Sequence, residues 1–119
     1  DLEGIGDTIG YWMIANAGLA GLGVALAGGH PLSVFVGAIA SPFTSLNPAL
    51  AAGWFAGYTQ YKMQRPTGLD ASEFLVVDDI RGLWKNRVGR ILLVTAFGNL
   101  GSSLGAWLAG AAIVGSIIG

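Results

Sequence analysis

Three uncharged, mostly apolar stretches separated by polar segments set the pattern of this chain. Residues 9–29 give 21 consecutive positions without a formal charge, residues 32–61 give 30, and residues 91–118 give 28. A helix of about 20 apolar residues matches the roughly 30 Å hydrocarbon core of a bilayer. The pattern therefore predicts an all-α membrane protein, a small bundle of about three transmembrane helices.

Small residues recur every four positions in the first and last stretches. The sets are Ala17, Gly21, Ala25 and Gly29, then Gly101, Gly105 and Ala109, and on a second face Ala111, Gly115 and Gly119. This spacing lets helix backbones approach closely in lipid. Together with residues 53–57, these faces exceed what three helices need among themselves, so we expect a homo-oligomer.

The second stretch is interrupted near its middle. The run from Ser41 to Pro48 contains two prolines and four polar side chains, and proline disrupts a helix interior. We therefore predict two half-helices, residues 31–40 and 48–61, which together cross the membrane once. Asn47 suits the N-cap of the second half and Pro48 its first turn. Irregular backbone at this depth should face the bundle interior.

Residues 62–90 form the charged segment and hold all six Lys and Arg residues. From Ser72 to about Arg90 the apolar residues have helical spacing, with acidic side chains early and basic ones late, which complements the helix dipole. The residues on the predicted stripe are Val76, Ile80, Trp84 and Val88. The segment thus predicts an amphipathic interfacial helix.

The placement of Lys and Arg also predicts orientation, because basic residues favour the cytoplasmic side. Segment 62–90 is then cytoplasmic in a multi-pass protein of the cell membrane. With three crossings the N-terminus is cytoplasmic too, and the C-terminus is outside. An alternative is that residues 32–61 re-enter and return to the same face, which moves the N-terminus to the other side.

Composition supports lipid as the solvent and narrows the chemistry. The chain is 53% hydrophobic and 11% charged, with a mean hydropathy of +0.62, whereas soluble domains carry about 25% charged residues. The net charge of −1 gives no basic footprint for nucleic acid. With no Cys and a single His, His30, neither a metal site nor another cofactor is expected.

Polar side chains inside the apolar stretches are the candidate site. If the helices that carry Asn16 and Asn99 both enter the membrane from the cytoplasm, the two side chains lie at matching depth. They could then share one plane with Asn47. The full candidate set is Asn16, Thr44, Ser45, Asn47, Asn99, Ser102 and Ser103. These groups either form interhelical hydrogen bonds, about 0.6 kcal/mol each, or line a cavity that binds an ion or a peptide.

One short motif points to an enzyme but lacks its context. Residues 101–105 match G-x-S-x-G, which carries meaning on a strand-to-helix turn with a base within reach. Here the motif lies in a glycine-rich apolar stretch, and His30 is predicted in an external turn. We expect no enzymatic activity of this chain on its own.

Two runs are distinctive as sequences, Pro42-Phe43-Thr44-Ser45-Leu46-Asn47-Pro48 and Trp84-Lys85-Asn86-Arg87-Val88. Shorter ones are residues 14–18, 30–32, 52–54, 65–67, 90–94 and 99–103. Over nearly the whole chain they resemble the C-terminal membrane region of the TraB/PrgY pheromone-shutdown family, which is similar to the Tiki and GumN proteins.

This resemblance implies that residues 1–119 are one integral membrane domain of a longer protein with an N-terminal TraB domain. Metal-dependent peptidase chemistry has been proposed for that domain, and its His and Glu motifs are not carried over to any residue here. The implied function is a membrane anchor and helix-packing or oligomerisation domain of a protein that acts on a peptide pheromone. The alternative is a conduit or binding site for a peptide or ion at the broken second stretch.

Overall fold

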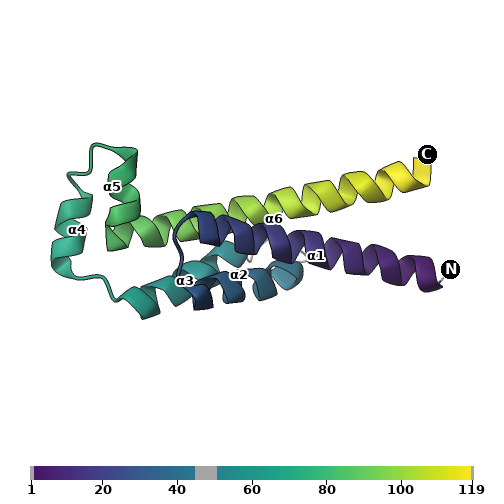
Figure 1. Ribbon diagram of the computed structural model, residues 1–119, viewed down its shortest axis with the longest axis horizontal. Coiled ribbons are helices and arrows are strands. Elements are labelled where there is room, and N and C mark those ends of the chain that lie inside the picture. Colours follow the sequence, from purple (N-terminus) through teal and green to yellow (C-terminus); the bar gives the residue numbers. More distant parts are fainter. Residues whose placement is uncertain (1, 45–50, 119) are drawn as a thin grey trace.

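The computed structural model describes residues 2–44 and 51–118. Within these ranges it contains helices and no strand, and the helices are α1 (Leu2–Leu26), α2 (Pro31–Thr44), α3 (Ala52–Gln64), α4 (Gly68–Phe74), α5 (Ile80–Lys85) and α6 (Arg87–Ile118). Figure 1 shows α1 and α6 running along the 57 Å long axis, with α2 and α3 beside one half of them. The predicted all-helical class is confirmed.

Helix α1 is continuous although glycine is frequent in it. Each interior glycine costs roughly 1 kcal/mol in water, but in lipid every backbone group must bond within its own segment, which favours a helix. The helix ends in a Schellman motif, with Gly28 at a φ of 78°. The amides of Gly28 and Gly29 donate to the carbonyls of Ala25 and Val24. This left-handed position requires glycine.

Helices α2 and α3 correct the predicted single crossing of residues 32–61. They form an antiparallel hairpin whose two outer ends meet, because the His30 amide donates to Gln60 Oε1 at 2.7 Å. Helix α2 also continues through Pro42 to Thr44, beyond the predicted end at residue 40. The hairpin therefore enters and leaves at one end of the bundle.

The start of α3 differs from the prediction as well. Its N-cap is Ala51, which has extended backbone and no side-chain cap. The predicted cap and first turn, Asn47 and Pro48, lie outside the described residues, as does Ser45. The expected half-helix is present as Ala52–Gln64.

The hairpin places the His30 turn at the same end as the charged segment. The Trp84 indole donates to the Leu26 carbonyl at 3.0 Å, which joins the end of α1 to α5. The first residues of α1 and the last of α6 lie at the opposite end (Figure 1). The ends of the hairpin lie together, as the re-entrant alternative expects and the three-crossing arrangement does not, and the first residues of α1 do not share an end with segment 62–90.

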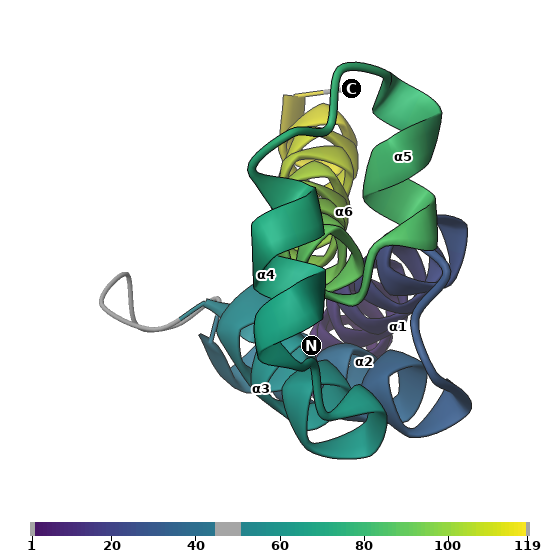
Figure 2. The same cartoon turned by 90° about the vertical axis from the view of Figure 1, so that its left-hand side faces the viewer.

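The charged segment is not the single amphipathic helix predicted over 72–90. Short helices α4 and α5 cross the end of the bundle in both views (Figure 1 and Figure 2). Asp79 Oδ1 caps α5 through the amide of Arg81, and Asn86 Oδ1 caps α6 through that of Gly89. These caps start new helices at residues 80 and 87, and the extended backbone at Asp79 and Asn86 interrupts the predicted single helix. Val76 and Ile80 are consequently exposed.

The predicted ridge on the last stretch packs against α1. Gly101, Gly105 and Ala109 are buried. A Cβ on Gly101 would collide with the Leu19 carbonyl, and one on Gly105 with that of Ala15. This ridge is confirmed, whereas the second predicted face is not packed, since residues 111 and 115 are exposed.

The small-residue face predicted for α1 is divided between two environments. Gly21 is buried against Ala38 and Val34 of α2, while Ala25 is exposed. The contact with α6 instead uses Gly23, where a Cβ would collide with the Phe97 carbonyl. The four-residue spacing therefore identified part of the face that packs on α2, but it missed the glycine that packs on α6.

Glycines of α3 are also used inside the chain. A Cβ on Gly53 would strike the Thr95 carbonyl, and one on Gly57 would strike the Thr95 hydroxyl. The expectation of a homo-oligomer relied on these faces and on the Gly101 ridge. Because both are occupied within one chain, oligomerisation loses that argument and stays a prediction.

Candidate functional site

A polar cluster joins α1, α2 and α6 in the bundle interior. The Ser41 hydroxyl lies 2.7 Å from that of Ser102 and donates to Asn16 Oδ1 at 3.4 Å. The Asn16 amide nitrogen donates to the Trp12 carbonyl at 3.1 Å. Asn16 and Ser41 are fully buried, so three helices are linked through one short chain of hydrogen bonds.

The cluster lies well inside the bundle, away from the end that carries the His30 turn. Asn16 precedes Leu26, the end of α1, by ten residues, or about 15 Å of helix. This is half of the roughly 30 Å hydrocarbon thickness. The last turn of α2, with Ser41 and Thr44, thus brings polar groups to this distance from the polar end, within the run that interrupts the apolar sequence.

Asn99 does not join this cluster. Helices α1 and α6 are antiparallel, so Asn16 lies beside Gly105, several residues further along α6 than Asn99. The predicted matching depth assumed that both helices enter from one side, and it is wrong. Asn99 Oδ1 instead accepts from the Gly53 amide at 2.8 Å, near the start of α3. It serves as an N-cap supplied by another helix, in place of Ala51.

The remaining predicted site residues fall into three groups. Thr44 is buried, and its hydroxyl donates to the Ser41 carbonyl at 3.2 Å. Ser103 is exposed on the continuous helix α6, so the G-x-S-x-G match does not sit on a strand-to-helix turn. Ser45 and Asn47 lie outside the described residues. Ser41 was missed as a site residue, although it begins the interrupted run.

A second buried polar group was also missed, at the outer end of the hairpin. Gln60 is fully buried, and its Oε1 accepts from the His30 amide and, at 2.9 Å, from the Ser33 hydroxyl. Gln60 follows Gly53 by seven residues and Gly57 by three, so helical spacing puts all three on one buried face. That spacing could have identified it.

Trp84 and Arg90 hold the charged segment on the long helices. The Arg90 guanidinium donates to the Trp84 carbonyl through Nε at 2.9 Å and Nη2 at 2.5 Å. The Trp84 ring packs edge-on against Phe97, with centroids 5.9 Å apart. Since the same indole donates to Leu26, one side chain connects α1, α5 and α6.

Asp70 ties α4 to the start of α6. Its carboxylate accepts from the Thr67 amide at 2.8 Å and lies 3.8 Å from the Arg87 guanidinium, while its carbonyl accepts from Asn86 Nδ2. The hydrogen bond from the Thr67 backbone is the main reason that the pKa of Asp70 lies below its ordinary value, and Arg87 adds to it.

The chemistry available in the two interior clusters, around Asn16 with Ser41 and around Gln60, is that of neutral amides and hydroxyls. Within residues 2–44 and 51–118, no three His, Cys, Asp or Glu side chains gather in a way that could hold a metal ion. Several of the contacts pair groups from different helices, among them Ser41 with Ser102, Ser33 with Gln60, and Gly53 with Asn99. The arrangement is therefore suited to fixing helix positions in a medium without water.

Comparison with known proteins identifies the family. The family described as "TraB family protein, C-terminal domain" matches residues 2–118. The chain is also 34% identical over 98 residues to the uncharacterized protein MJ1365 of Methanocaldococcus jannaschii. That match covers 81% of this chain and 25% of the relative, so the chain spans about a quarter of its length. No solved structure matches.

Proposed function

The chain belongs to the TraB family, as its C-terminal domain, and from this premise we propose that it is the membrane anchor of a longer protein. Two helices, α1 and α6, cross the bilayer, and the α2–α3 hairpin enters it to mid-depth. Helix packing and the polar cluster hold the hairpin in place.

The exposed apolar surface of the long helices is the observation that carries this proposal. Gly4–Leu26 and Arg87–Ile118 are long and apolar enough to span a membrane. The apolar core helix of a soluble protein would be mostly buried, but only 22% and 17% of their most apolar windows are. Ile14 and Trp107, for example, are more than 70% exposed. Such surface needs lipid or protein around it.

Charge and geometry together suggest an orientation different from the one expected from sequence. All six Lys and Arg residues lie in segment 62–90, which favours the cytoplasm for that end. The first residues of α1 and the last of α6 are at the opposite end (Figure 1). We therefore place both of them outside, and any domain joined directly to α1 with them.

Any catalytic activity of the full-length protein is proposed to lie in a part of the protein other than this chain. We propose that peptidase activity or pheromone shutdown, which the sequence resemblance implies, resides in the part of the protein outside this chain. The anchor then sets the side of the membrane on which that chemistry takes place.

Cysteine labelling in intact cells tests the anchor and its topology. Because this chain has no native Cys, the labelling of each single-cysteine variant reports on that position in the chain. Cysteines at His30 and Thr67 should both be protected from an impermeant thiol reagent added outside. A cysteine at Gly4 should react. If only one of positions 30 and 67 is labelled from outside, the three-crossing arrangement is favoured instead. Recovery of the protein in the soluble fraction would refute the anchor.

A conduit centred on the polar cluster is the second candidate, and the mid-depth position of that cluster favours it. If the cluster only packs, the activity of full-length Ser102→Ala protein should stay proportional to the amount that is folded. Normal folded protein without activity would instead support the conduit.

A further inference from the structure

The two long helices form a pair of surface hollows at the end of the bundle opposite segment 62–90. We call this the distal end, residues 4–11 of α1 and 112–118 of α6 (Figure 1). One hollow has a polar lining that includes Asp7, Thr8 and Ser116. The other is mainly apolar, and its lining includes Ile5, Ile113 and Ile117. Polar and apolar groups thus lie side by side at this end.

The polar hollow offers mostly hydrogen-bond acceptors. The Thr8 hydroxyl donates at 2.9 Å, and the Ser116 hydroxyl at 2.8 Å, to a backbone carbonyl in the preceding turn of its own helix. Each hydroxyl has a single proton, so both oxygens can only accept from a group in the hollow. Asp7 adds an exposed carboxylate, and the Tyr11 hydroxyl can donate or accept. A partner at this hollow therefore has to donate, and a cation matches it.

The chain itself supplies no cation at the distal end. All six Lys and Arg residues lie in segment 62–90, at the other end of the 57 Å long axis (Figure 1). A second copy with the same orientation in the membrane has its own basic residues on the opposite side of the bilayer. A second copy is therefore not the source of the cation either.

The order of polar and apolar groups along the helices also differs from that of a phospholipid. Asp7 precedes Leu26 by 19 residues, about 29 Å of helix, so it lies at the far boundary of a hydrocarbon core about 30 Å thick. Ile117 lines its hollow with Gly4 and Ile5, nearer the end than Asp7, and is 79% exposed. A phospholipid carries its cationic group outside its acyl chains. Apolar side chains outside a carboxylate require a protein surface instead.

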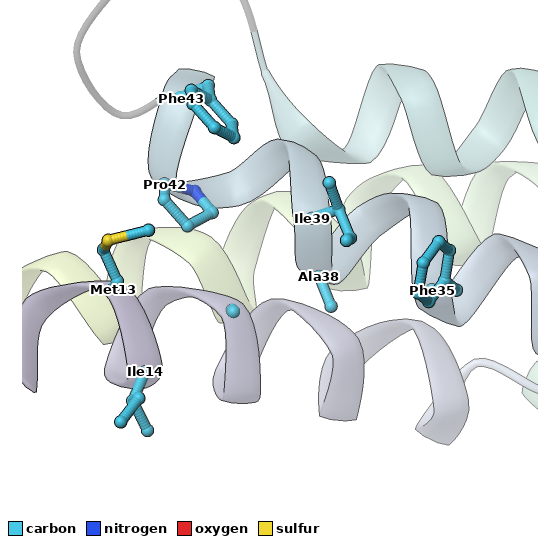
Figure 3. Close-up of a pocket in the computed structure, with 8 residues that line it drawn as sticks. Met13, Ile14, Phe35, Ala38, Ile39, Pro42 and Phe43 are labelled. Carbon is cyan, nitrogen blue, oxygen red and sulfur yellow. The ribbon is translucent and has the colours of Figure 1, made fainter. Parts of the chain in front are cut away.

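The pocket between α1 and α2 shows the contrast. Figure 3 shows Met13, Phe35, Pro42 and Phe43 around it. Its lining contains no polar side chain, so it requires nothing of an occupant beyond apolar character. The distal end combines acceptors with apolar side chains, and that combination specifies a partner.

We propose that the distal end is the docking surface for the part of the full-length protein that precedes this chain. That part presents an apolar patch to Ile113 and Ile117 and a Lys or Arg to Asp7. The proposal rests on the proposed anchor of a longer protein. The chain matches a C-terminal domain and a quarter of the length of its relative. Because α1 begins at the distal end, a preceding domain is held there at high effective concentration.

Site-specific photo-crosslinking tests the proposal in the full-length protein, in the membranes of the cells that express it. The probe is p-benzoylphenylalanine in place of Ile117, and the control carries it in place of Leu108, an exposed residue nine positions earlier on α6. Position 117 should crosslink within the same polypeptide, to a peptide that precedes residue 1 and is identified by mass spectrometry. Position 108 lies within the hydrocarbon core and should crosslink to lipid.

A charge change tests the predicted cation. Asp7→Lys, added to the variant with the probe at position 117, should lower the crosslink yield several-fold because like charges repel. The matched control Asp78→Lys makes the same change at an exposed position in segment 62–90 and should leave the yield unchanged. Equal yields for the two variants would overturn the proposal.

The other outcomes separate this inference from the anchor itself. A crosslink from position 117 to lipid, to another protein or to a second copy would contradict docking, as would no crosslink at all. Mixing chains labelled with ¹⁵N and unlabelled chains distinguishes a second copy from the same polypeptide. A full-length protein that does not sediment with membranes would refute the anchor, whereas a membrane-bound protein whose position 117 crosslinks only to lipid would refute docking alone.

Discussion

Two halves of the same helix pair behave differently. In the packed half, α2 and α3 cover α1 and α6. In the arm, residues 4–13 and 106–118, the two long helices continue without them (Figure 1). Ala109 is the one buried residue within those arm ranges, whereas the packed half contains the core of Val24, Ala27, Ala56 and Val94. Both halves are apolar, so burial here is decided by neighbours.

Glycine shows the contrast most directly. A Cβ on Gly23, Gly53 or Gly101, in the packed half, would meet backbone atoms of another helix. A Cβ on Gly10 or Gly110, in the arm, would meet nothing within 4 Å. A glycine-rich apolar helix therefore contains two kinds of glycine, and only one kind allows helices to approach.

The difference arises from helix length. Helices α2 and α3 have 14 and 13 residues, about 20 Å each, while α1 and α6 have 25 and 32, about 37 and 48 Å. The hairpin therefore ends where the polar cluster lies. Beyond it, the apolar side chains of the arm are mostly exposed, since no helix of the described chain covers them.

Glycine substitutions should give the largest difference in unfolding free energy between the packed half and the arm. Gly101→Leu would force a side chain into the backbone of α1, and such overpacking costs about 3 kcal/mol or more. Gly110→Leu, in the arm, should change the unfolding free energy little. Thermal unfolding in detergent, followed by circular dichroism, measures both, and equal effects would contradict the division into two halves.

Removing the cap of α3 should have the next largest effect. Asn99→Ala leaves the Gly53 amide without its acceptor, at a cost of about 1–3 kcal/mol for an unpaired buried group. Ser103→Ala, on the exposed side of α6, is the control and should be neutral. Chemical unfolding measures stability, and faster hydrogen exchange of the Gly53 amide should accompany the loss. A stable Asn99→Ala protein would mean that α3 needs no cap from α6.

The hydroxyl contacts should contribute less. Ser102→Ala removes the α6 partner of Ser41 from the polar cluster that joins α1, α2 and α6. An interhelical hydrogen bond in a membrane contributes about 0.6 kcal/mol on average. Ser116→Ala is the matched change in the arm, where the hydroxyl donates only to Ile113 of its own helix. We expect a small loss for the first and none for the second by the same unfolding assay. A larger loss of unfolding free energy for Ser116→Ala than for Ser102→Ala would mean that the Ser116 side chain packs against a partner in the arm.

Acid should produce the smallest and most local change. The pKa of Asp70 is lowered in the folded chain by the Thr67 amide and by Arg87, so its contribution to stability is fully present above the ordinary pKa of 3.8. The contribution is lost as the pH falls through the lower, folded value. The Thr67 amide resonance should shift in that acid range and stay constant between pH 8 and pH 5. Asp70→Asn should abolish the shift, and Glu73→Gln should keep it.

Much of the local structure followed from the chain itself. The long apolar stretches predicted α1 and α6, and the Gly101 ridge predicted the α6 face that packs. The interruption at Ser41–Pro48 correctly separated two half-helices. The 72–90 helix failed because the periodicity of Val76 and Ile80 was outweighed by caps at Asp79 and Asn86. Such caps are visible in sequence but compete with periodicity locally.

The candidate site was predicted in composition more than in arrangement. Asn16 and Ser102 do meet, but through Ser41, and Asn99 caps α3 instead of sharing their plane. The pairing depends on α1 and α6 being antiparallel, and that depends on whether residues 32–61 cross or return. Composition does not distinguish these paths, because both bury the same residues in the same solvent.

The sequence by itself determined the two long apolar helices and the single end that carries the basic residues, since these depend on residue type and local spacing. Only the tertiary structure decided that α3 turns back. That choice depends on contacts between residues far apart in the chain, such as Gln60 with His30 and Trp84 with Leu26. No local pattern encodes such contacts, because each partner is an ordinary polar or aromatic residue until the fold brings the two together.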